Sequence, residues 1–309
     1  MEGMSTIDIG AVLPSATEEL TDPRTPGIAA AAVAVEEHGL ESLWVADLVL
    51  GDGTPALEPA LTLAAAASVT RRVRLGFGVL SVPPRPAPWL ATQIATLQHL
   101  SANRLLLGVG IGGFPDSPLW RALGVPTKGR GRATDATLEL LPPLVTGEEV
   151  RFEEADTTLR LAPAAPMPPV LVGGTEKAFD RILRVGAGWL PSQLSPADLL
   201  AAAERLRARA REQGLPRPQI TLGGHLILGE GSSAREAYDT LVRQLVEEHG
   251  IPEEEAARGP MLARTPEELA ELYSAYAEAG ADRVIAGADN LGWEEQLDFI
   301  GRARALLPG

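Results

Sequence analysis

The sequence predicts an α/β protein built as one eight-stranded (β/α)8 barrel, and three observations lead to it. Short apolar runs of strand length alternate with helix-length segments along all 309 residues, as in repeated βαβ units around a parallel sheet. Eight such runs can be counted. Glycines also gather directly after several of the runs, where a barrel presents its ligand site. The runs lie near 7–13, 42–46, 73–79, 104–109, 169–172, 188–190, 219–228 and 282–286.

The segment from Val73 to Gly113 is the clearest of these units. Alternate apolar residues fill 73–79, and two prolines then close the strand. Pro88 suits the first turn of a helix, along which apolar residues recur at helical spacing. The run 105–109 is continuously apolar, which is typical of a strand buried on both faces. The segment therefore reads as strand, crossover helix and strand.

The other elements follow in order around that unit. Residues 27–38 are rich in alanine, and Gly39 is a helix stop. Two short segments, 149–152 and 158–161, are expected to pair as a hairpin. The remaining helices are expected near 59–70, 132–144, 176–185, 196–213, 266–279 and 292–306.

Two stretches depart from the alternation. Residues 114–129 are rich in proline and glycine and predict a long loop at the C-terminal face of the barrel. Residues 232–264 are charged and predict a helical extension packed outside it. Because the chain contains no internal repeat or linker, residues 1–309 are interpreted as a single domain.

Composition excludes several classes of function. A formal net charge of −14 disfavours nucleic-acid binding, which needs a basic face. The absence of cysteine excludes disulfides, thiolate catalysis and cysteine-bound metals. No apolar run is long enough to span a bilayer, and the first residues do not read as a signal peptide. We therefore expect a cytoplasmic protein with a small-molecule substrate, no nucleic-acid or membrane partner and no metal site.

The turn Gly173–Gly174–Thr175 is the strongest candidate binding element. It directly follows an apolar strand and precedes a helix. Free N–H groups at a helix start, with glycines that allow close approach, form an anion site. The alternative is a tight turn in which Thr175 only caps the helix.

The chain as a whole resembles the luciferase-like monooxygenase family, the flavin- or deazaflavin-dependent (β/α)8 enzymes. No single motif decides this, but the ordered set covers nearly the whole chain. The segments are VRLGFGVLSVPPRPAPWLATQIATLQHLSANRLLLGVGIGG at 73–113, LESLWVADLVL at 40–50, PPVLVGGTEKA at 168–178, VGAGWLPS at 185–192 and TPEELAELYSAYAEAGADRVI at 265–285.

The resemblance assigns expected roles to four segments. The turn 173–175 would hold the cofactor phosphate, and Gly78, Val79 and Ser81 would buttress the flavin ring, with a non-proline cis bond at Gly78–Val79. Gly110, Ile111 and Gly112 would meet the ring or its side chain, and Asp47 would lie near its pyrimidine end. Asp47 is also the one weak catalytic candidate. The structural alternatives are glycines required by packing and a helix-capping or salt-bridging Asp47.

Two positions depart from the family pattern. Many redox-active relatives have a histidine directly after the acid, where this chain has Leu48, and sugar-phosphate dehydrogenases have a glutamate where it has Gly113. Of the histidines, His225 alone falls on a predicted strand and could point into the pocket. The basic residues Lys128, Arg130 and Arg132 form a cluster that would suit an anionic ligand. Trp120 and Trp189 are candidates to wall the pocket or to pack in the core.

The resemblance implies an oxidoreductase that transfers a hydride between coenzyme F420, a 5-deazaflavin, or FMN and a small organic substrate. The composition, rich in alanine, glycine and arginine, is similar to that of actinobacterial members and favours coenzyme F420. An FMN-dependent monooxygenase and a non-catalytic flavin-binding homologue are the alternatives. Family members are commonly dimers, so a homodimer is expected.

Overall fold

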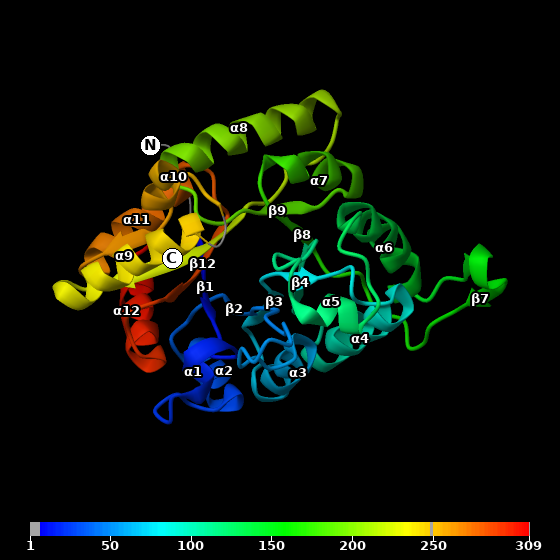
Figure 1. The fold of residues 1–309 in the computed structure, drawn as a ribbon, viewed down its shortest axis with the longest axis horizontal. Helices are drawn as coiled ribbons and strands as arrows, with labels where there is room; N and C mark the ends of the chain where they lie inside the picture. The colour runs from blue at the N-terminus through cyan, green and yellow to red at the C-terminus, as the bar shows by residue number, and fades with distance from the viewer. Residues whose placement is uncertain (1–6, 248–249, 309) are drawn as a thin grey trace.

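The computed structural model describes residues 7–247 and 250–308. Its main sheet is parallel and curls into a ring with helices outside (Figure 1). Eight strands form the ring in the order β1-β2-β3-β5-β8-β9-β10-β12. They are β1 Asp8–Val12, β2 Ser42–Val45, β3 Arg74–Phe77, β5 Leu105–Gly110, β8 Val170–Gly173, β9 Gly188–Leu190, β10 Thr221–Leu228 and β12 Arg283–Ala288.

The ring closes between β9 and β10. Parallel bridges join Trp189 to Ile220 and Ser192 to Gly223, and the Gly223 N–H donates to the Pro191 carbonyl at 2.8 Å. On the other side, β12 pairs with both β10 and β1. The fold is therefore the predicted (β/α)8 barrel, and each of the eight predicted strands is confirmed within about two residues.

Most helices cover the outside of the ring, as expected. The principal ones are α2 Ile28–Glu37, α3 Pro59–Val69, α4 Ala87–Ser101, α6 Arg130–Val145, α7 Phe179–Val185, α8 Pro196–Glu212, α11 Pro266–Glu278 and α12 Trp293–Ala305. The hairpin is confirmed as the antiparallel pair β6 Val150–Phe152 and β7 Thr157–Leu159.

Two segments differ from their sequence-based description. The 114–129 loop contains a short helix, α5 Pro118–Ala122, which Ser117 caps. The 232–264 extension contains the helices α9 Ser232–Glu247 and α10 Glu253–Arg258, and then a strand, β11 Met261–Ala263. That strand pairs with the last three residues of β10, so the extension contributes to the sheet instead of packing only outside it.

The middle of the barrel is filled by large apolar side chains. Trp44, Leu106, Leu171, Leu190 and Ile285 form one buried cluster. Gly10 and Gly76 make room for the Trp44 ring, since a Cβ on them would lie 2.7 and 2.2 Å from its atoms. The described side chains thus pack the middle of the barrel, and a ligand is expected to bind above this layer.

The N-terminal base of the barrel is held by a buried arginine. The Arg283 guanidinium donates to both oxygens of Glu41 at 2.7 Å, and it also bonds Asp8 and Thr221 at 3.2 Å. Burial, and then the nearby Glu41 carboxylate, raise the pKa of Asp8. This network closes the end of the barrel opposite the strand ends that carry the candidate site.

Candidate functional site

A bend after β3 forms one wall of the barrel mouth. The peptide bond between Gly78 and Val79 is cis, which confirms the sequence prediction. The chain then continues as β4, Leu80–Ser81, which pairs with the end of β5. The bend therefore turns Val79 toward the centre of the mouth.

Val79 is the point where three predicted segments meet. A Cβ at Gly110 would lie 2.7 Å from Val79 Cγ2, and one at Gly173 would lie 2.9 Å from Cγ1. Both glycines are thus required by the packing of Val79. For Gly110 this is the structural alternative expected from the sequence, whereas for Gly173 the alternative was a tight turn. Val79 is itself partly exposed and packs on the apolar layer below, so it forms a low apolar platform at the mouth.

Asp47 braces the same wall. Its carboxylate accepts from the Ser81 N–H at 2.8 Å and pairs with the Arg85 guanidinium at 2.7 Å. Glu58 caps α3 through the Leu61 N–H, and it lies 3.9 Å from Arg85. The salt-bridging alternative for Asp47 therefore applies. Arg85 was not predicted as a site residue, although its place in the proline-rich turn directly after β4 could have indicated it.

The segment after β5 leads into the 114–129 loop, which lies against the Asp47 wall. Gly112 has a φ of 84°, and a Cβ there would lie 2.5 Å from the Trp120 ring. Arg130 lies over that ring and donates to the Gly112 carbonyl. Ser117 Oγ donates to the Leu50 carbonyl at 2.5 Å. Only a small cavity of about 30 Å³ remains between loop and wall, so the loop is closed on this side.

The turn after β8 is the open part of the site. Gly174 has a φ of 123°, both Gly174 and Thr175 are exposed, and the nearest atom to a Cβ on Gly174 would be 3.8 Å away. The Thr175 side chain makes no capping hydrogen bond, so the simple-cap alternative is not what the structure shows. The buried Trp189 donates from Nε1 to the Gly174 carbonyl at 2.8 Å, which fixes the turn.

The structure therefore brings the four predicted segments together. Asp47 contacts Ser81, Val79 lies between Gly110 and Gly173, and Ser81 Oγ is 3.7 Å from a Cβ built on Gly112. The exceptions are Ile111, which is exposed, and Thr175, whose side chain points to no partner among the described residues. Leu48 is half-buried, and Gly113 has open space around it.

The basic cluster separates into two kinds of residue. Arg130 is held against Trp120 and the Gly112 carbonyl, as described above. Lys128 and Arg132 are exposed at the start of α6. They remain available to an anion at the rim beyond the loop.

The described histidines differ in what their rings contact. The rings of His38 and His99 bond backbone carbonyls near helix ends, at 2.8 and 3.0 Å. His249 lies outside the described residues. His225 Nδ1 lies 2.8 Å from Asp289 Oδ1, a partner that the sequence did not reveal. Asp289 follows β12, the neighbour of β10, so the order of strands around a barrel could have suggested the pair.

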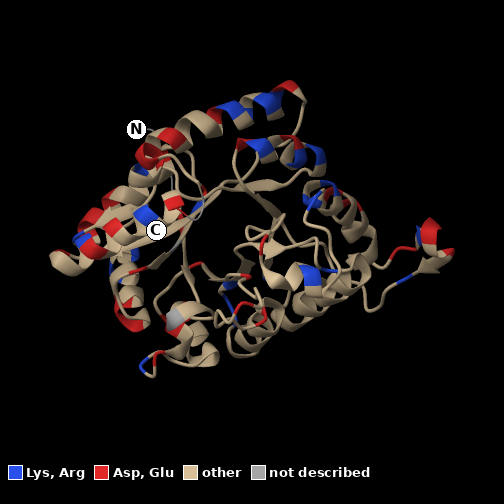
Figure 2. Cartoon of the chain, viewed as in Figure 1, with Lys and Arg blue, Asp and Glu red and all other residues tan. Residues whose placement is uncertain are grey.

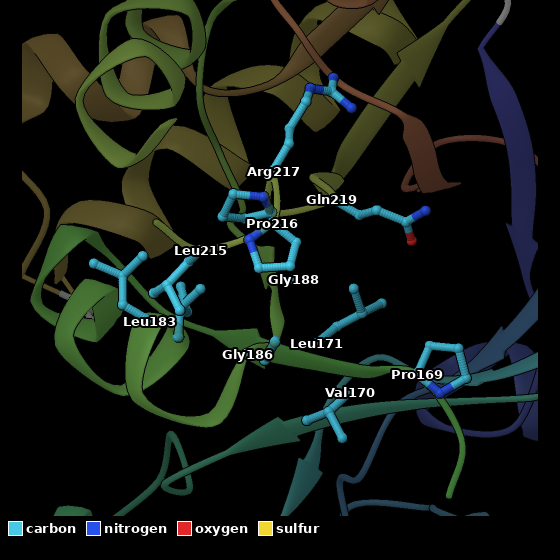
Figure 3. Close-up of a pocket in the computed structure, with 13 residues that line it drawn as sticks. Pro169, Val170, Leu171, Leu183, Gly186, Gly188, Leu215, Pro216, Arg217 and Gln219 are labelled. Carbon is cyan, nitrogen blue, oxygen red and sulfur yellow. The ribbon is translucent and has the colours of Figure 1, made fainter. Parts of the chain in front are cut away.

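The roomiest hollows lie elsewhere. One of about 340 Å³ lies between α6, α7 and the start of β8, and another of about 180 Å³ lies beside it at the starts of β8 to β10 (Figure 3). Both are at the base of the barrel and are lined mainly by apolar side chains and glycine. Since barrel enzymes place their chemistry at the C-terminal face, we assign the site to the mouth despite its smaller open volume.

Comparison with known proteins agrees with this geometry. The family model of the luciferase-like monooxygenases matches residues 7–296, so the chain belongs to that family. A curated relative, 4-hydroxyprotoasukamycin monooxygenase of Streptomyces nodosus subsp. asukaensis, is 34% identical over 67% of this chain and 60% of its own length. The match spans less than two thirds of the length of the first curated relatives. For a Mycobacterium tuberculosis protein that is 35% identical, it covers 57% of that protein's length.

Solved structures share the fold over almost the whole chain. An F420-dependent secondary alcohol dehydrogenase in complex with an F420–acetone adduct has a TM-score of 0.77 at 18% identity, covering 96% of this chain and 99% of its own. The oxygenating constituent of 3,6-diketocamphane monooxygenase from Pseudomonas putida, in complex with FMN, has a TM-score of 0.74 at 17% identity, covering 97% and 98%. The fold thus serves both cofactors.

The residues at the mouth fit a flat ring with a phosphate tail. The Val79 platform is apolar and partly exposed, with the backbone of Gly110 and Gly173 beside it, and the open turn at Gly174 lies past its edge. Among the described residues, no three acidic or imidazole side chains gather as a metal site requires. Within the same ranges, no helix is long and apolar enough to cross a membrane.

Proposed function

We propose that this chain is an oxidoreductase that binds coenzyme F420 at the barrel mouth and transfers a hydride between it and a small organic substrate. The observation that carries the proposal is the convergence of four segments at the mouth: Gly110 and Gly173 pack on Val79, and Asp47 and Gly112 lie beside Ser81. When bound, the deazaflavin supplies a two-electron hydride acceptor and donor.

Each part of the mouth has a role in that proposal. Val79 supports one face of the ring, and Asp47 with Arg85 keeps the platform in place. The N–H groups at the start of the 176–185 helical segment receive the phosphate, because they lack partners within the helix. The 114–129 loop covers the Asp47 side and limits water there.

FMN is the second candidate cofactor, since a solved structure of this fold holds it. FMN would allow the chain to act as a monooxygenase, which a deazaflavin would not. The absence of the family histidine at Leu48 and of the glutamate at Gly113 leaves a third candidate, a non-catalytic flavin-binding homologue.

The test is a titration of the purified protein with coenzyme F420 and, separately, with FMN, followed by quenching of ligand fluorescence. We expect saturable binding of coenzyme F420 and at least tenfold weaker binding of FMN. Tighter binding of FMN would assign the monooxygenase alternative. Binding of neither would overturn the proposed function.

We also propose that two copies associate through helices α3 and α4. Neither helix contains an acidic residue, lysine or arginine (Figure 2), and both expose apolar side chains: Leu61 is 72% exposed and Trp89 is 65% exposed. In a chain with a net charge of −14, copies repel each other except across an uncharged face. An exposed apolar face of this kind is typical of a protein interface.

A charge placed at the centre of this face tests the association. Leu61→Glu is expected to convert a dimer to a monomer, because it buries an unpaired carboxylate at the interface. Light scattering coupled to size exclusion measures the mass. Leu200→Glu on the charged helix α8 is the matched control, since Leu200 is also exposed. A monomeric wild type, or a dimer that survives Leu61→Glu, would contradict the proposal.

A further inference from the structure

Half of the positions in the top layer of the barrel interior are glycines. By strand alternation, each strand places one residue there, on the strand or just beyond its end. These residues are Val12, Ala46, Gly78, Gly110, Gly173, Ser192, His225 and Gly287. Among them, His225 alone has an ionisable side chain.

The direction of the His225 side chain follows from its neighbour Gly223. A Cβ on Gly223 would lie 3.5 Å from Leu190 Cδ2 and 3.9 Å from Ile285 Cγ1, and both side chains belong to the apolar layer inside the barrel. Residues two apart on a strand point the same way. His225 therefore points into the barrel, one layer above Leu190 and Ile285.

His225 also lies across the mouth from the Val79 platform. In the ring order, β10 is four strands from β3 in either direction. A Cβ on Gly78 would lie 3.5 Å from Ile285 Cδ1, and the same Ile285 side chain approaches Gly223 on the other side. The Ile285 side chain thus lies between β3 and β10, and the space above it lies between Val79 and His225.

The ring of His225 is oriented by a carboxylate. Nδ1 lies 2.8 Å from Asp289 Oδ1, and Nε2 has no protein partner among the described residues. The side chains are 45% and 33% exposed, so solvent and ligands can reach them. A carboxylate on Nδ1 holds the imidazole with its proton there and leaves Nε2 as a base.

We propose that His225 is the catalytic acid–base of this site and that Asp289 is its positioning residue. This rests on the proposed function. It places the proton-transferring group on the wall opposite Val79, in a chain that has Leu48 where relatives have histidine. A base beside a hydride acceptor suits a substrate that loses a hydroxyl proton together with its hydride, that is, a small alcohol and its carbonyl product.

Nε2 of His225 accepts the hydroxyl proton of the alcohol, and the carbinol carbon passes its hydrogen, as hydride, to the oxidised deazaflavin. The C–H and O–H bonds break and a C=O bond forms, so the alcohol is oxidised by two electrons and the deazaflavin is reduced. In the reverse direction the imidazolium returns the proton to the ketone oxygen.

Asp289 faces His225 from the end of β12, and Glu19 of α1, Thr17–Thr21, faces Asp289 from outside. Asp47 and Arg85 neutralise each other on the opposite wall.

The experiment compares wild type with His225→Asn, Asp289→Asn and the control His38→Asn, which lies on an outer helix. Affinity for coenzyme F420 is measured by fluorescence. Reduction of coenzyme F420 by propan-2-ol, butan-2-ol and cyclohexanol is measured against pH, together with the reverse reaction of the ketones. Nitrogen-15 NMR of the cofactor-free protein reports which imidazole nitrogen of His225 carries the proton.

His225→Asn is expected to lower kcat by roughly 10²- to 10³-fold and to remove one ionisation from the pH profile, with affinity for the coenzyme unchanged. Asp289→Asn is expected to lower kcat less and to abolish the Nδ1–H preference seen by NMR. His38→Asn should match wild type.

Several results would overturn the assignment: equal kcat and pH profile in wild type and His225→Asn, an Nε2–H tautomer in the wild type, or no turnover of any alcohol or ketone by a protein that binds the coenzyme. Absence of coenzyme binding would instead overturn the proposed function.

Discussion

The two ends of the barrel interior are built in opposite ways. At the base, Arg283 is 5% exposed and is surrounded by Glu41, Asp8 and Thr221, so each polar group has a partner. At the mouth, four of the eight interior positions are glycine, Val79 is partly exposed, and Nε2 of His225 has no partner among the described residues. Satisfied groups hold a fold together, whereas unsatisfied ones are available to a ligand.

The comparison predicts that damage at the base affects stability alone. Arg283→Leu leaves the Glu41 and Asp8 carboxylates close together without their cation, and loss of one partner of a buried ion pair costs about 3–5 kcal/mol. Urea denaturation measures the free energy of unfolding. Arg302→Leu is the control, since its pair with Asp298 is exposed and 3.9 Å long, and it should change by less than about 1 kcal/mol. An equally small effect of Arg283→Leu would remove the distinction between the two ends.

At the mouth the expected loss is in binding. Gly174→Asp places a carboxylate among the N–H groups proposed to face the phosphate. At about 4 Å and an effective dielectric of about 20 the repulsion is about 4 kcal/mol, or roughly a thousandfold in affinity.

Gly174→Ala is the matched variant, because the φ of 123° strains any side chain there but alanine adds no charge. Coenzyme affinity and Tm are measured together on both. If the two variants bind coenzyme equally well, the phosphate lies elsewhere.

Asp47 lies at the mouth, but its carboxylate is fully partnered, as the polar groups at the N-terminal end of the barrel are. It therefore tests whether position in the barrel or bonding decides the effect of a mutation. Its side chain is 5% exposed and bonded to Arg85 and Ser81. Asp47→Asn is expected to lower the free energy of unfolding by about 2 kcal/mol, as for a lost charged hydrogen bond, and to weaken coenzyme binding as the platform shifts. Loss of affinity with unchanged stability would instead indicate that Asp47 contacts the ligand directly.

The smallest effect concerns Glu19. Burial, together with the nearby Asp289 carboxylate, raises its pKa, although a hydrogen bond from Gln296 opposes this. The ionised form is therefore unfavourable in the fold, and Glu19→Gln should stabilise the protein at pH 7 by less than about 1 kcal/mol.

Because the pKa of Glu19 is raised in the folded protein, the effect of Glu19→Gln on stability depends on pH. As the pH falls through the raised pKa, native Glu19 takes up a proton first, so wild type gains stability relative to the variant. The advantage of Glu19→Gln should be gone below the ordinary glutamate value of 4.5. Glu271→Gln, at an exposed site, is the control both at pH 7 and at a pH below 4.5. A stabilising effect of Glu19→Gln that grows at low pH would contradict the raised pKa of Glu19.

The sequence predicted the eight ring strands because apolar runs and helical periodicity are local signals. It also predicted that Asp47, Val79, Gly110 and Gly173 meet, since strand ends of a barrel share one face. It did not reveal Arg85 or Asp289, because each is a partner defined by three-dimensional contact with a residue 38 or 64 positions away. Strand β4 was missed because two residues carry no periodicity, and β11 because its surroundings are helical and charged.

Strand β11 has a consequence for how this protein can diversify. The hydrogen bonds that close the ring lie at Ile220 and Gly223, below the three residues of β10 that β11 pairs with. The strand beside β10 just above His225 is therefore β11, and the bridges that close the ring do not involve it. Changes of length or sequence in residues 229–264 are therefore expected to leave the ring closed while they alter the surroundings of the proposed substrate site.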